Sequence, residues 1–163
     1  DKTEEWAKGL VNNFSRKPQG NDRAQIMAVA NGEATLGIAN SYYIGIMLSG
    51  RSGEAQLAAA NKVKIHFPNQ NDRGTHINIS GAGILKSAPN HENAVKFLEF
   101  LLSERVQKHM VDLSYEYPVL DGINPHPSIA SFGENFLEDS TSVADYGKYN
   151  TDAVMLMDRA GWQ

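Results

Sequence analysis

Two adjacent tyrosines, Tyr42 and Tyr43, have the side chains of this sequence best suited to metal chemistry. They follow Asn40 and Ser41, where a short apolar run gives way to a helical pattern. A helix N-terminus presents free N–H groups and partial positive charge, which stabilise a phenolate or an anion. A phenol normally loses its proton near pH 10, but a trivalent cation displaces that proton when it binds. The resulting tyrosinate is a hard, anionic oxygen ligand that suits Fe(III).

The same doublet also has a purely structural interpretation. Successive helical residues point about 100° apart. Two adjacent tyrosines therefore converge on one ion only at an irregular junction between elements. For an isolated pair, one core aromatic and one surface aromatic is the commoner arrangement.

The surrounding pattern places the doublet between a strand and a helix. An apolar run at 34–39 predicts a buried strand, and ligands gather beyond the carboxyl ends of such strands in open α/β sheets. Alternation predicts two more strands at 63–67 and 76–80. Helices are predicted at 3–14, 22–30, 43–48, 54–60, 89–102, 104–111 and 149–159. This order indicates an α/β fold with a mainly parallel sheet, although the strands are too few for a complete doubly wound domain.

The composition excludes several classes of function. The chain has 163 residues, a net charge of -4 and no cysteine. An acidic chain without a basic cluster does not suit nucleic acid, and the lack of cysteine removes disulfides, iron–sulfur clusters and thiol nucleophiles. No apolar run approaches the roughly 18 residues that span a bilayer. Because the chain opens at Asp1, we expect a processed or truncated product that lacks an N-terminal portion.

Several motifs occur in the order found in one known family. Beside the doublet in 40–45, they are KPQGND at 17–22, FPNQ at 67–70, GTHINISGAG at 74–83, AVKFL at 94–98, YEYPV at 115–119 and MDRAGW at 157–162. With these motifs the chain resembles the C-terminal half of the periplasmic ferric-iron-binding proteins, the bacterial transferrins. The resemblance covers essentially the whole chain.

The resemblance implies a fold and a set of ligands. It implies a truncated type II periplasmic-binding-protein fold with parts of both lobes: 1–74 from the C-terminal lobe, 75–122 from the N-terminal lobe, and 123–163 as helices returning to the C-terminal lobe. It implies Tyr42 and Tyr43 as ligands of Fe(III). It also implies that Asn40, with Asn21 as the nearest match for a second asparagine, contacts a synergistic anion.

The implied protein is the substrate-binding component of an ABC transporter, not an enzyme. It would capture Fe(III) in the periplasm and deliver it to an inner-membrane permease. Two phenolates leave most of an octahedral ion open, so this chain alone is expected to bind Fe(III) weakly or not at all. Unpaired sheet edges recruit other chains, so self-association is expected as well.

Three alternatives remain open at this stage. The same fold could bind another small ligand, such as a polyol, a phosphonate or an organic cation. A serine hydrolase using Ser80 and His76 would lack a positioned third member of the triad. His66 and His76 could share a metal, although strand positions at a lobe boundary are the commoner explanation.

Overall fold

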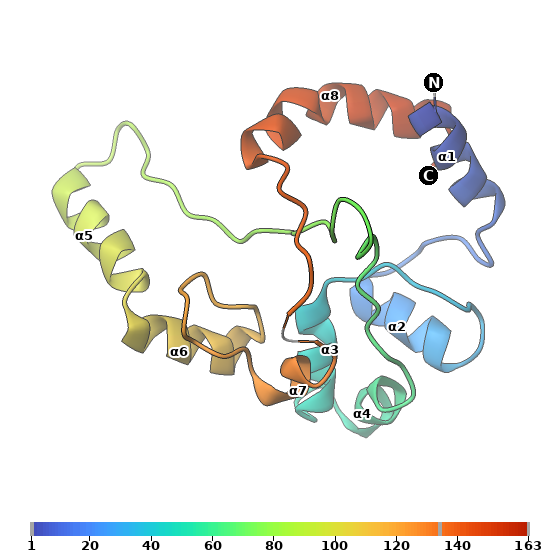
Figure 1. Cartoon of the computed structure of the whole chain (residues 1–163), viewed down its shortest axis with the longest axis horizontal. Helices are drawn as coiled ribbons and strands as arrows, with labels where there is room; N and C mark the ends of the chain where they lie inside the picture. The colour runs from blue at the N-terminus through green and yellow to red at the C-terminus, as the bar shows by residue number, and fades with distance from the viewer. Residues whose placement is uncertain (1, 134, 163) are drawn as a thin grey trace.

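The computed structural model describes residues 2–133 and 135–162 (Figure 1). Eight helices lie within these residues: α1 (Lys2–Asn12), α2 (Asp22–Ala30), α3 (Ser41–Leu48), α4 (Glu54–Ala60), α5 (His91–Leu101), α6 (Glu104–Ser114), α7 (Pro127–Ala130) and α8 (Val143–Arg159). All seven predicted helices are confirmed, with shifted ends. The largest shift is in α8, which begins six residues earlier than the pattern indicated because Ser142 caps it.

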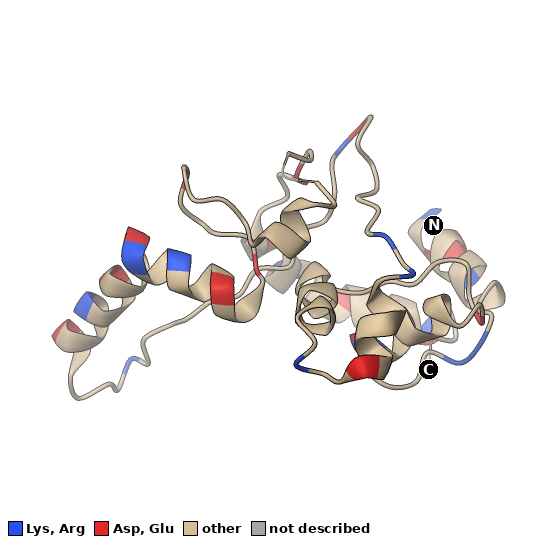
Figure 2. Cartoon of the chain, turned by 90° about the horizontal axis from the view of Figure 1, so that it is seen from below, with Lys and Arg blue, Asp and Glu red and all other residues tan. Residues whose placement is uncertain are grey.

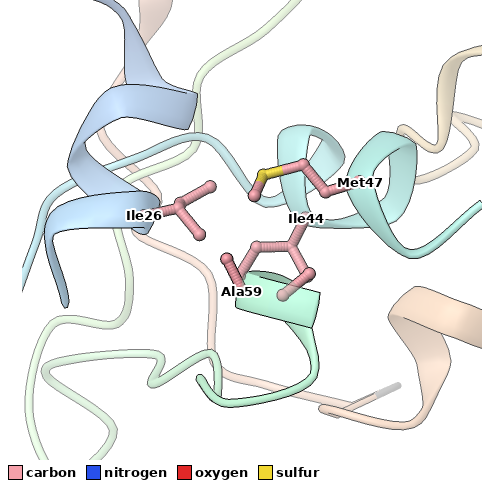
Figure 3. Close-up of a cluster of buried hydrophobic side chains, with 5 residues drawn as sticks. Ile26, Ile44, Met47 and Ala59 are labelled. Atoms are coloured by element: carbon pink, nitrogen blue, oxygen red, sulfur yellow. The ribbon is translucent and has the colours of Figure 1, made fainter. Parts of the chain in front are cut away.

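The main core lies among three short helices, and α7 packs against one of them. Ile26 of α2, Ile44 and Met47 of α3, and Ala59 of α4 pack together in a buried cluster (Figure 3). Helix α7 packs against α3 and contributes Ile129, which has no exposed surface. This packing fixes α3, the helix that carries the tyrosine doublet.

The first and last helices pack against each other. Arg159 of α8 donates to Glu4 of α1 across 3.2 Å. Close by, the rings of Phe14 and Trp162 meet edge to face with centroids 5.0 Å apart. Helices α1 and α8 therefore lie side by side (Figure 1). Within α1, Ala7 is buried whereas Trp6 is 59% exposed.

Helices α5 and α6 pack against each other, and α5 lies at one end of the molecule (Figure 1). No described residue of α5 is buried, and Phe97 is 58% exposed. In Figure 2 acidic and basic residues are interspersed along both helices. This agrees with the lack of a basic cluster in the sequence. None of the helices within 2–133 and 135–162 is long and apolar enough to cross a membrane.

The three predicted strands form no ladder within the described residues. The predicted alternation is nevertheless present at 63–67, where Val63, Ile65 and Phe67 are half-buried between exposed neighbours. A strand requires a hydrogen-bonded neighbour as well as an alternating pattern, and these segments lack one in the described part of the chain. The predicted parallel sheet is therefore not observed, and the α/β class remains a prediction.

One isolated parallel bridge joins Thr75 to Glu138. Thr75 N–H donates to the Leu137 carbonyl across 2.7 Å, and its carbonyl accepts from the Asp139 N–H across 2.8 Å. The approach is so close that a Cβ on Gly74 would lie 2.5 Å from the Glu138 carbonyl carbon. Only glycine, which also has a φ of 89° here, fits this crossing.

Candidate functional site

The tyrosine doublet lies in the first turn of α3. The helix begins at Ser41, two residues before the predicted start, and Asn40 is its extended N-cap with φ -72° and ψ 138°. The Tyr43 N–H donates to the Asn40 carbonyl across 3.2 Å, which closes the first turn. The doublet is therefore at the junction where the sequence predicted it, although the segment before it is unpaired rather than a strand.

The two tyrosine rings lie against each other. Their centroids are 4.3 Å apart and their planes are inclined by 34°. Both side chains are half-buried, and Tyr43 also packs against the buried cluster around Ile44 and Met47. The arrangement of one buried and one exposed aromatic is therefore not observed. Instead the doublet presents two neighbouring phenols supported by the core.

The surroundings of Tyr42 favour its neutral form. A hydrogen bond with the Tyr43 phenol is the largest cause that raises the pKa of Tyr42 to about 12, followed by burial. The charges of Tyr43, Asp22 and Glu116 raise this pKa further. Ionisation without a cation is therefore unfavourable at neutral pH. A multivalent cation would reverse this preference, because it replaces the proton and is attracted by the nearby carboxylates.

Asn40 is held on two sides by hydrogen bonds. Asp22 Oδ1 accepts from the Asn40 backbone N–H across 2.7 Å and from its Nδ2 across 3.0 Å. On the other side, Asn40 Oδ1 accepts from Asn78 Nδ2 across 2.8 Å. The side chain makes no cap hydrogen bond to α3. One amide thus links the start of α2, the start of α3 and the segment around Asn78.

Asn21, the second predicted anion contact, is the N-cap of α2. Its side-chain oxygen accepts from the Ala24 N–H across 3.2 Å. Asn21, and not the neighbouring Asp22, caps α2. Asp22 is therefore free to contact Asn40. A capping role explains Asn21 without an anion, so its anion contact stays a prediction.

A second polar contact lies near the doublet. The Ser80 hydroxyl donates to Glu116 Oε1 across 2.8 Å. His76, the partner expected in a serine hydrolase, contacts the Tyr146 ring instead, with centroids 5.2 Å apart. Among the described residues no hydrogen bond joins His76 to Ser80, so the geometry gives the hydrolase alternative no support.

The shared histidine metal site also gains no support from the geometry. No group of three or more His, Asp or Glu side chains within 2–133 and 135–162 is arranged to hold a metal ion. His66 and His76 are not buried in a common site: His66 lies in the alternating segment 63–67, and His76 faces Tyr146. The tyrosine doublet therefore remains the candidate metal site.

Sequence reasoning missed three residues near the doublet: Asp22, Asn78 and Glu116. Their contacts join positions 18 to 38 residues apart. No local periodicity or motif encodes such long-range contacts. The only available signal for Asp22 was its place beside a helix N-terminus, which suggested a cap rather than a partner for Asn40.

Comparisons with known proteins agree on one kind of protein. Residues 1–108 match the family model described as bacterial extracellular solute-binding protein. The chain is 52% identical over 158 residues to iron uptake protein A1 of Synechocystis, a match that covers 97% of this chain and 43% of that protein. It is 31% identical over 121 residues to the major ferric iron-binding protein of Neisseria meningitidis, covering 74% of this chain and 33% of that one.

Solved structures give the same result. The fold superimposes on a Trichodesmium FutA (IdiA) in complex with iron and citrate, with a TM-score of 0.93 and 52% identity. That match covers 99% of this chain and 51% of the other. A ferric binding protein from Campylobacter jejuni matches with a TM-score of 0.91 and 38% identity, covering 98% of this chain and 50% of that one. This chain therefore spans about half the length of these relatives.

Proposed function

This chain belongs to the bacterial extracellular solute-binding protein family, and on that premise we propose that it carries two tyrosinate ligands of a periplasmic Fe(III) receptor. The proposed receptor serves an ABC transporter: it captures Fe(III) and delivers it to the inner-membrane permease. The similarity to iron uptake and ferric iron-binding proteins supports this cargo.

The observation that carries the proposal is the paired geometry of Tyr42 and Tyr43. Their rings lie 4.3 Å apart at the start of α3. Two phenolates on one ion repel each other and each loses a proton, so a cation of high charge is required to hold them. Fe(III) meets both requirements, because it is trivalent and prefers anionic oxygen. A polyol or an organic cation would gain little from two ionised phenols.

Asn40 is the proposed anion contact beside the iron. One hydrogen of Asn40 Nδ2 is donated to Asp22 Oδ1, and the other makes no hydrogen bond within the described residues. The citrate in the Trichodesmium structure supports an anion of this kind. Asn21 is a weaker candidate for the same role, because its side-chain oxygen already caps α2.

The internal packing of the chain supports the proposed division into lobes. Helices α7 and α8, in 123–163, pack against α3 and α1, in 1–74. Helices α5 and α6, in 75–122, pack against each other. We infer that 1–74 and 123–163 belong to one lobe and that 75–122 is part of the other.

Two ligands fill only part of an iron coordination sphere, so we expect this chain alone to bind Fe(III) weakly. A titration with ferric citrate, followed by the visible tyrosinate-to-iron absorption, tests the proposal. The absorption is expected to appear only at high iron concentration and to be lost in a Tyr42→Phe/Tyr43→Phe variant. An equal absorption in that variant would contradict the assignment of the ligands.

A further inference from the structure

The acidic residue at the start of α2 has an unusual set of partners. Asp22 Oδ1 accepts two hydrogen bonds from Asn40, at 2.7 Å from the backbone N–H and at 3.0 Å from Nδ2. Among the described residues, no Lys or Arg forms an ion pair with Asp22. The neighbouring Arg23 donates to Ser52 instead. The carboxylate of Asp22 is thus committed to one residue, which lies 18 positions further along the chain.

The residue that Asp22 holds determines where the tyrosine helix begins. Asn40 is the N-cap of α3, and its carbonyl accepts from the Tyr43 N–H. An asparagine at an N-cap normally turns its side chain onto the helix. Here the amide is turned away, because Nδ2 donates to Asp22 and Oδ1 accepts from Asn78. The two partners together fix the rotation of the Asn40 amide.

From this geometry we infer that Asp22 is a positioning residue: through Asn40 it sets the start of α3 and hence the directions of the Tyr42 and Tyr43 phenols. This inference rests on the proposed function for its consequence, iron binding. If the first turn of α3 unwinds, Tyr42 and Tyr43 lose the helical backbone that now sets the directions of their side chains. Even a partial loss of the Asp22–Asn40 contact would move apart two phenols that must bind the same ion.

Two substitutions at Asp22 distinguish a role that depends on the position of its oxygen from a role that depends on its negative charge. Asp22→Asn retains an oxygen in place of Oδ1, which can still accept from both Asn40 donors, but removes the negative charge. Asp22→Glu retains the charge but moves the oxygens away by one methylene. If Asp22 acts by position, Asp22→Asn resembles the wild type and Asp22→Glu is defective. If Asp22 acts only by charge, the order is reversed.

Hydrogen exchange read by mass spectrometry provides a test without iron. In peptides covering residues 38–46 of the whole chain, Asp22→Glu is expected to speed exchange about tenfold, while Asp22→Asn stays within about threefold of the wild type. Peptides from α4 and α8 report whether the rest of the chain is folded. Asp152→Ala, which removes an exposed carboxylate on α8, is the matched control and should leave residues 38–46 unchanged.

The ferric titration then tests whether the hold of Asp22 on Asn40 affects iron binding by the tyrosine doublet. Asp22→Glu should weaken the tyrosinate-to-iron absorption about tenfold in apparent affinity, and more than Asp22→Asn does. Unchanged exchange at 38–46 in Asp22→Glu, or a larger defect in Asp22→Asn, would overturn the inference. A wild-type chain without any iron absorption would instead contradict the proposed function, while the exchange data would still decide whether Asp22 sets the start of α3.

Discussion

Gly45 of α3 lies directly against the ring of Tyr115. A Cβ added to Gly45 would lie 2.6 Å from Tyr115 Cβ and 2.7 Å from Cγ, closer than real side chains approach. Tyr115 is 3% exposed and has a left-handed backbone with φ 61° at the end of α6. The absence of a side chain at Gly45 thus allows the end of α6 to pack on the helix that carries the tyrosine doublet.

Gly45→Ala is therefore expected to destabilise the chain. Overpacking costs more than the helix propensity that alanine adds, so we expect a net loss of about 1–2 kcal/mol in the free energy of unfolding. Urea denaturation followed by circular dichroism measures it. Gly147→Ala is the matched control, because Gly147 lies in α8 and an added Cβ would meet nothing within 4 Å, so this change should be neutral or stabilising. Equal effects at the two positions would contradict the packing argument.

The raised pKa of Tyr42 predicts a loss of stability at high pH. Its folded pKa of about 12 lies above the ordinary tyrosine value of 10.0, so the folded state holds this proton more tightly than the unfolded state. The resulting stabilisation is complete below about pH 10 and is lost as pH rises towards 12. Urea midpoints at about pH 9 and about pH 11.5, on either side of the unfolded value, should differ less in Tyr42→Phe than in the wild type. An identical pH dependence in both proteins would show that Tyr42 does not ionise abnormally.

The two candidate anion contacts are expected to respond differently to mutation. Asn21→Ala removes the cap of α2 and should cost about 1 kcal/mol of stability, whereas Asn21→Ser retains a capping oxygen and should cost much less. Neither change should greatly alter the ferric absorption, whereas Asn40→Ala should weaken it. A large loss of that absorption in Asn21→Ser, with stability preserved, would instead make Asn21 part of the ligand site.

The sequence predicted the local elements well, because their signals are local. The predicted starts of α4 at residue 54 and of α6 at residue 104 are both confirmed. The alternation at 63–67 also predicted which side chains turn inward. Alternation alone could not show whether these segments pair into a ladder, because pairing depends on a partner segment. The contact between Asp22 and Asn40 was missed for the same reason: it joins two distant parts of the chain.

Exposed apolar residues in the unpaired segment before the doublet predict self-association. Leu36 is 82% exposed and Ile38 is 78% exposed. Covering such side chains with a second copy removes apolar surface from water. Light scattering at micromolar concentration is expected to find a dimer or larger species, and Ile38→Asp should shift it towards monomer. Val154→Asp, at a position 60% exposed on α8, is the control. A wild-type chain that is strictly monomeric would contradict this prediction.

The central claim is that the Tyr42 and Tyr43 phenolates bind Fe(III). Resonance Raman spectroscopy with visible excitation tests it most directly, because only phenolates bonded to iron are enhanced. The wild-type chain mixed with excess ferric citrate is expected to give tyrosinate vibrations, which weaken in each single Phe variant and vanish in Tyr42→Phe/Tyr43→Phe. Tyr149→Phe, which changes an exposed tyrosine of α8, should leave the spectrum intact. Tyrosinate vibrations that persist at wild-type intensity in the double variant would contradict the account.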